Sequence, residues 1–417
     1  MLRTYLQLPR TVYVLSLGTL INRAGTLLIP FLTLYLVEHL HTTMRFATWG
    51  MATYGLGCMG AVLVGGHFAD AVGRRVTMVV ATFGSATLMF TLSFLTNKWS
   101  MVACVGVLGF VGEMFRPACS AMIADVTPPE LRKAAYSLQY VAINLGFSIA
   151  PVVGGFIVER SSYHWLFWID AATTTCLGVI IVVGIRESLH LAHAEHAASA
   201  HAQSSSSAGL RHVVTDGTFV VFCLATLAIS MMYMQAVSTL PLYFKDLGIG
   251  KEQYGQIIAV NGAMIALLQL PFAAWLMRFD RSRLMPLSSL VTGVGFGLIA
   301  FAHTPLAFVG TVVVWTAGEM MAAVLVQPIV SDLAPPRLRA RYMGVLSMCF
   351  AGGSVVGIPL GGEVLARHGG QALWLGCLGA SATAALLYFS IRRRIREHPP
   401  TATTAAAPAE EATVANM

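Results

Sequence analysis

Charged residues are scarce in this sequence: they form 11% of its 417 residues, whereas soluble globular domains carry roughly 25%. The signatures of common catalytic sites are also missing, because the chain contains no CxxC pair, HExxH helix, GxSxG turn or Walker loop. These absences exclude the enzyme classes that depend on such motifs. We expect a protein that is not an enzyme and that binds no cofactor and no metal.

Hydrophobic residues dominate instead, at 56% of the chain. A helix needs about 20 apolar residues to cross a bilayer, and twelve runs of that kind occur. They predict an all-α integral membrane protein with 12 transmembrane helices in a lipid bilayer. The runs are residues 11–37, 47–66, 76–96, 101–124, 136–158, 164–185, 217–244, 254–277, 284–303, 306–330, 342–365 and 372–391.

Arginine and lysine residues concentrate in the short segments that share a side with the N-terminus, as do Arg74, Arg132 and Arg392. Under the positive-inside rule this bias places both termini in the cytoplasm of a multi-pass cell-membrane protein, with a bacterial inner membrane as the preferred location. The net charge of +7 therefore orients the chain. We expect no nucleic-acid partner, because the basic residues form no single stripe.

One segment occurs twice, from Gly112 to Gly155 and from Gly318 to Gly362. Each copy begins with Gly-Glu-Met and ends with Gly-Gly. A duplicated half implies two pseudo-symmetric six-helix bundles around an axis that passes through a functional cavity. We place the N-terminal bundle at residues 1–185 and the C-terminal bundle at 217–397.

The segment between the bundles, residues 186–216, has few apolar residues and a run of serines, which is typical of a linker. Its histidines could suggest a metal-binding tract, but no cysteine and few carboxylates accompany them, so we expect no metal site. These are His190, His193, His196 and His201. The tail at 398–417 is rich in Ala, Thr and Pro and is predicted to be disordered.

A short motif joins the second and third spans: GGHFADAVGRR, from Gly65 to Arg75. It resembles the G-x-x-x-D-R-x-G-R-R signature of the major facilitator superfamily, from which Ala71 departs. The resemblance implies a conformational latch, in which Asp70 holds the outward-open state by facing the start of span 11 near Tyr342. A turn that only orients the two spans is the alternative. The matching residues are Gly66, Asp70, Gly73, Arg74 and Arg75.

Span 5 contains NLGFSIAPVVGG, which resembles the antiporter motif G-x-x-x-G-P-x-x-G-G of the same superfamily, with Ala150 in place of one glycine. Small residues let helices approach closely, and an internal proline bends a helix. We therefore predict a gate or hinge, with ordinary helix packing as the alternative. Its residues are Gly146, Pro151, Gly154 and Gly155.

Four ionisable residues lie near the middle of apolar spans, where each charge costs about 2.5 to 3.5 kcal/mol. Glu113 and Arg116 are three residues apart and can meet on one helix face. Glu319 has no cation nearby in the sequence, so it is the better candidate for an exchangeable proton, with Glu113 second. Arg23 or Arg116 would then favour proton release. A permanent ion pair that holds the bundle together is the alternative.

Scattered polar residues within the spans are candidates for the lining of a substrate cavity. They are Asn22, Gln139, Asn144, Tyr233, Gln235, Asn261, Gln269 and Gln327.

The resemblance is to the 12-span drug:proton antiporter branch of the superfamily. It implies a monomeric transporter that works by alternating access and uses the proton gradient to export small lipophilic or cationic molecules. A proton-coupled sugar or metabolite exporter or symporter of the same fold is the main alternative. A non-transporting receptor is a further one, although it would leave the carboxylates in the middle of the spans without a role.

Overall fold

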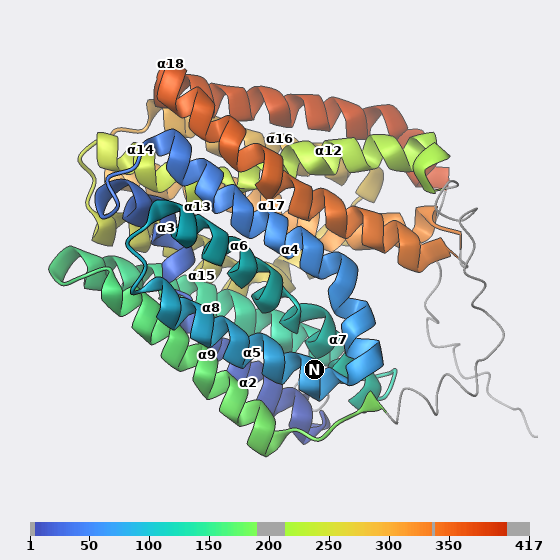
Figure 1. Cartoon of the computed structure of the whole chain (residues 1–417). Coiled ribbons are helices and arrows are strands. Elements are labelled where there is room, and N and C mark those ends of the chain that lie inside the picture. Colours follow the sequence, from blue (N-terminus) through green and yellow to red (C-terminus); the bar gives the residue numbers. More distant parts are fainter. Residues whose placement is uncertain (1–4, 190–212, 336–337, 398–417) are drawn as a thin grey trace, which may run out of the picture.

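The computed structural model describes residues 5–189, 213–335 and 338–397. The predicted tail at 398–417, most of the predicted linker and its four histidines lie outside the described residues. Helices without strands make up the described part (Figure 1). The all-α prediction is therefore confirmed.

The N-terminal half contains six membrane crossings, two of which are broken into shorter helices. Span 1 is α2 and α3, and span 4 is α6 and α7. The helices are α2 (Arg10–Ala24), α3 (Leu28–Glu38), α4 (Met44–Val72), α5 (Arg74–Leu92), α6 (Lys98–Glu113), α7 (Phe115–Val126), α8 (Arg132–Arg160) and α9 (His164–Gly184).

The C-terminal half repeats this plan, with span 7 broken into three pieces. Its elements are α12 (Gly217–Tyr233), α13 (Gln235–Ser238), α14 (Leu240–Asp246), α15 (Lys251–Leu276), α16 (Arg281–Leu298), the short η1 (Ile299–Phe301), α17 (Pro305–Leu333) and α18 (Arg339–Glu397).

Eleven helical stretches of the described residues are long and apolar enough to cross a membrane, and the last, Arg341–Arg396, has 56 residues. A straight helix of that length would extend about 84 Å, far beyond a hydrocarbon core of about 30 Å. The chain instead reverses within α18 at Gly369, where φ is 79°. Figure 1 shows α18 folded back on itself. This stretch therefore crosses twice, and the predicted twelve-helix architecture is confirmed.

A proline lies shortly after one break in each broken span. Pro30, Pro117 and Pro241 each lack the N–H that would bond to the carbonyl four residues earlier. Helix α2 ends at Ala24 and α3 starts at Leu28, while α6 and α7 part at Met114. Spans 1, 4 and 7 were each predicted as one continuous run, so the breaks within them are a finding of the structure.

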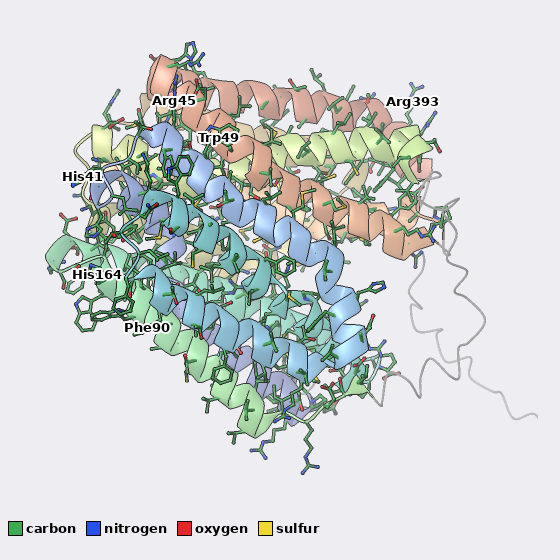
Figure 2. All side chains as sticks on the ribbon, viewed as in Figure 1. His41, Arg45, Trp49, Phe90, His164 and Arg393 are labelled. Atoms are coloured by element: carbon green, nitrogen blue, oxygen red, sulfur yellow. The ribbon has the colours of Figure 1, made fainter. Side chains whose placement is uncertain are left out.

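The two halves contact each other mainly through two helix pairs, α8 with α15 and α4 with α18. We call the end of the molecule with Arg10 and Glu397 the terminal end, and the opposite end the far end. Figure 2 shows His41 and His164 at the far end and Arg393 at the terminal end. In Figure 1 the halves lie together at the far end and diverge toward the terminal end. The predicted boundaries of the halves stay predictions.

Candidate functional site

Ion pairs join the halves at the far end. The Glu38 carboxylate lies 2.7 Å from the Lys251 ammonium and 3.7 Å from that of Lys245. Arg160 pairs with Glu252 at 2.5 Å, and the carboxylate of Glu159 accepts the backbone N–H of Lys251 at 2.9 Å. A second contact of this kind joins α4 to α18, where Arg45 and Glu363 lie 2.8 Å apart. Between described residues of the two halves, ion pairs and hydrogen bonds lie only at this end.

The predicted hinge residues of α8 lie in close contact with other helices. A side chain at Gly146 would overlap Arg23 and Ala24 of α2, and one at Gly154 would meet the Phe31 ring of α3. The opposite half is equally close, because a Cβ on Gly155 would lie 2.5 Å from the Lys251 carbonyl oxygen. Small residues at these positions let α8 approach α2, α3 and α15 closely. Whether they act as a gate stays a prediction.

Pro151 belongs to the same contact. Its carbonyl oxygen lies directly against Gly255 of α15, where no side chain could fit. The Phe31 ring meets Tyr254 edge-on, with ring centroids 5.5 Å apart. The halves are therefore packed backbone to backbone between the middle of the spans and the far end.

The residues of the predicted latch lie at the terminal end, within the N-terminal half. Gly73 adopts φ 117°, which confirms that a glycine allows the chain to reverse there. Asp70 pairs with Arg74 at 2.9 Å, and its side chain is 70% exposed. Gly66 is partly exposed, and a Cβ there would touch nothing within 4 Å. Among the described residues Asp70 pairs only with Arg74, and its contact with span 11 stays a prediction for the outward-open state.

Two carboxylates that the sequence did not single out complete this cluster. Arg74 is buried and also lies 3.2 Å from Asp125, which accepts the hydroxyl of Ser188. Glu187 accepts the backbone N–H groups of Arg74 and Arg75, each at 3.0 Å, and so caps the start of α5. The terminal end of the N-terminal half is therefore a network centred on Arg74.

The charges in the middle of the N-terminal half form a local pair. Glu113 and Arg116 lie 2.5 Å apart across the break between α6 and α7, as predicted, and the Arg116 side chain is 61% exposed. The guanidinium of Arg23 lies 5.2 Å from the centre of the Phe147 ring. One more acid, Asp170 of α9, lies in this half with no solvent exposure. The sequence signal was available, because Asp170 interrupts the apolar run HWLFWIDAATTT.

Glu319 is placed differently, near the middle of α17 in the other half. Its carboxylate accepts a hydrogen bond from the Asn261 amide of α15 at 2.7 Å, and the same amide reaches the Thr316 hydroxyl at 3.0 Å. Among the described residues, no ion pair includes Glu319. Glu113 is therefore paired within the N-terminal half, and Glu319 is hydrogen-bonded within the C-terminal half. The role of Glu319 in proton exchange stays a prediction.

Several predicted cavity residues bond across helices within one half. Gln139 is buried and donates to Thr19 at 2.9 Å, while Gln235 donates to the Gly357 carbonyl at 2.8 Å. Gln269 donates to the Met320 carbonyl at 3.2 Å. These contacts are typical of helix packing. Their role in substrate binding stays a prediction.

The remaining predicted cavity residues lie in varied surroundings. Asn22 donates to Thr174 at 2.8 Å, and Asn144 to the Tyr140 carbonyl of its own helix at 2.9 Å. Tyr233 lines a small cavity of about 30 Å³ inside the C-terminal half. Gln327 is exposed. The sequence named Asn261 as a cavity candidate and did not predict its bond to Glu319.

Comparisons with known proteins point to one family. Residues 15–250 and 230–416 match the sequence profile of the Major Facilitator Superfamily. The uncharacterized MFS-type transporter YqjV of Bacillus subtilis (strain 168) is 24% identical, covering 84% of this chain and 85% of its own length. The Na(+), Li(+), K(+)/H(+) antiporter of Planococcus maritimus is 26% identical, covering 80% and 84%. Multidrug resistance protein MdtH of Edwardsiella ictaluri (strain 93-146) is 23% identical, covering 82% and 84%.

Solved structures agree on the fold. The peptide transporter POT in complex with sulfate superposes with a TM-score of 0.79 at 16% identity, over 93% of this chain and 95% of that one. The nucleoside transporter NupG superposes with a TM-score of 0.72 at 15% identity, over 91% and 98%.

Proposed function

This chain belongs to the Major Facilitator Superfamily, and from that premise we propose that it is a proton-coupled antiporter that exports small lipophilic or cationic molecules. The fold and the family make it a multi-pass membrane transporter. Proton coupling, export and the substrate class are our proposals.

Glu319 supports the coupling step. It lies in the middle of an apolar helix, accepts one hydrogen bond from Asn261 at 2.7 Å and takes part in no ion pair among the described residues. An ionised carboxylate in that setting is costly, so proton binding relieves the cost. A cationic molecule approaching the ionised form would relieve it as well. The proton and a cation therefore compete for one charge, which is the physical basis of exchange.

The contacts between the halves support alternating access. Described residues of the two halves form ion pairs at the far end, among them Arg45 with Glu363 and Arg160 with Glu252. We infer that the structure is closed at the far end, and that the other state requires these pairs to separate while Asp70 approaches α18. With the positive-inside bias, the terminal end is cytoplasmic and this is the inward-facing state. We place the protein in a bacterial inner membrane as a monomer.

The Glu113 pair has a supporting role in this scheme. Arg116 neutralises Glu113 at 2.5 Å, so Glu113 is the weaker candidate for a proton that must leave and return in each cycle. Arg23, whose Nε is buried without a hydrogen-bond partner, supplies a positive charge in the same half.

A second candidate function is exchange of monovalent metal cations for protons. It is favoured by the relative from Planococcus maritimus, which is named as a Na(+), Li(+), K(+)/H(+) antiporter and is 26% identical over 80% of this chain. The same carboxylate would serve both functions, because each exchanges a proton for a positive charge.

Proteoliposomes with a pH-sensitive dye inside would test both functions. The purified protein would be reconstituted with a proton gradient across the vesicle membrane. Ethidium, potassium, sodium or a neutral sugar would then be added in turn. We expect proton movement with ethidium and none with the sugar. Movement with sodium or potassium alone would favour the second candidate, while movement with the sugar alone would contradict both.

A further inference from the structure

A cavity of about 70 Å³ lies inside the N-terminal half, apart from Glu319. Its wall is formed by α2, α3, α4, α5, α6, α7 and α9, and it is lined by polar groups that include Asn22, Tyr54, Ser85, Glu113 and Asp170. A cavity of this size has room for a few water molecules, and polar walls of this kind hold them. Glu113 and Arg23, which support the coupling scheme, line this cavity, but Asp170 has no role in that scheme.

Asp170 is the most confined acid of this cavity, with no solvent exposure at all. Its Oδ2 accepts the backbone N–H of Leu28 at 3.5 Å, a long and weak hydrogen bond where α3 begins. Thr174, one turn along α9, lies near the carboxylate, yet Oδ1 is buried and accepts no hydrogen bond among the described residues. Buried polar atoms are nearly always paired, so an orphaned carboxylate oxygen facing a polar cavity needs a ligand of its own.

Other groups around the same cavity show the same deficit. The Ser85 hydroxyl oxygen, on a residue that is 4% exposed, and the Nε of Arg23 are buried and have no hydrogen-bond partner in the described part of the chain. These atoms belong to α5 and α2, so the deficit is not confined to one helix. Water molecules in the cavity would satisfy them and would connect them to Asp170.

The charged and titratable groups that face Asp170 come from three helices. Arg23 faces it from α2, Tyr54 from α4 and Glu113 from α6, while α3 and α5 contribute no titratable side chain to the cavity wall. Glu113 already pairs with Arg116 at 2.5 Å, whereas no ion pair among the described residues includes Asp170. Asp170 is therefore the acid of this cavity without a bonded cation.

We propose that Asp170 is a second proton-binding residue, separate from Glu319, and that water in this cavity delivers the proton to its Oδ1. An O–H bond forms at Oδ1 as a hydronium ion becomes water, and release is the reverse step. This proposal rests on the proposed function and deepens it, because it gives each half its own proton site. Protonation also removes the negative charge at the start of α3, where a helix favours an anion. Proton binding thereby acts on the broken span 1, which packs against the hinge residue Gly146.

Infrared difference spectra of the protein in lipid vesicles, recorded between alkaline and acidic pH, would test this directly. The wild type should show carbonyl bands of two buried carboxylic acids. Asp170→Asn should delete one band and keep the other, and Glu319→Gln should do the reverse. Asp246→Asn, which changes the exposed Asp246 at the far end, is the matched control and should keep both.

The outcomes separate this proposal from the proposed function. Asp170→Asn spectra identical to those of the wild type would overturn the second site and leave Glu319 in place. Loss of a band in Asp170→Asn but none in Glu319→Gln would support the second site and remove Glu319 as the coupling residue. If Asp170→Asn does not fold, Asp170→Glu keeps an acid and should move its band, and an unmoved band would count against the proposal.

Discussion

Gly255 of α15 lies against the carbonyl oxygen of Pro151 on α8, so that the two halves touch backbone to backbone. A methyl group on Gly255 would overlap that oxygen, and overpacking of this kind costs about 1 to 3 kcal/mol. Gly255→Ala should therefore destabilise the contact and favour separation of the halves at the far end.

Spin labels at Ser161 and His368, in a variant whose native cysteines are replaced, would measure that separation across the far end. Gly255→Ala should shift the distance distribution to longer values. Gly379→Ala is the matched control, because a Cβ at Gly379 would meet nothing within 4 Å. Equal distributions in the two variants would show that this contact does not hold the halves together.

The Glu38 contacts should act in the same direction. Glu38 faces both Lys245 and Lys251 from the other half, so Glu38→Gln removes an attraction shared by two cations. We expect more of the far-end-open population in the same spin-label measurement, and a smaller difference from the wild type at high salt because screening weakens the original pairs. A salt-independent difference would contradict the electrostatic explanation.

Arg74 should matter more for stability than its latch partner Asp70. The Arg74–Asp125 pair is nearly buried, with side chains 7% and 11% exposed, and removing one member of such a pair costs about 3 to 5 kcal/mol. Asp70 is 70% exposed, where an ion pair contributes about 0 to 1 kcal/mol. Thermal melting in detergent should show a much larger loss for Arg74→Gln than for Asp70→Asn. Equal losses would mean that the buried network does not stabilise this end.

His39 gives the far end a modest dependence on pH. Burial lowers the pKa of His39 from 6.5, and the nearby His164 and His41 lower it further. The folded state favours neutral His39. Its contribution to the free energy of unfolding is therefore fully present above pH 6.5 and is lost as the pH falls through the lower pKa of the folded state. Melting temperatures would be measured from about pH 8 to about pH 5, a range that includes the usual histidine pKa. The melting temperature should fall less over this range in His39→Gln than in the wild type. A parallel decline in both would remove His39 as the cause.

The sequence predicted the twelve crossings and the two bundles because both follow from the length of apolar runs and from a repeat. The Glu113–Arg116 pair was equally accessible, since a spacing of three residues places both side chains on one helix face. Asp170 was missed because it lies near the start of span 6, whereas the search for costly charges was confined to the middle of the spans. The backbone N–H of Leu28 bonds to Asp170 where α3 begins. Leu28 lies on another helix, so the sequence around Asp170 does not indicate this contact.

Contacts between distant segments account for the other differences. Glu187 and Asp125 come to Arg74 from segments far away in the sequence, and no local pattern indicates that arrangement. The same holds for Asn261 and Glu319, which lie on different helices. The polar residues Gln139, Gln235 and Gln269 looked like cavity lining by type alone, but type does not show whether a side chain bonds to a neighbouring helix.

Proton movement driven by an ethidium gradient, compared between wild-type and Glu319→Gln proteoliposomes, tests the central claim most directly. Glu130→Gln, which changes an exposed acid at the terminal end, is the matched control. We predict that Glu319→Gln abolishes proton movement in a protein that still reconstitutes as the wild type does, and that Glu130→Gln leaves it intact. Undiminished proton movement in Glu319→Gln would contradict proton exchange at this residue.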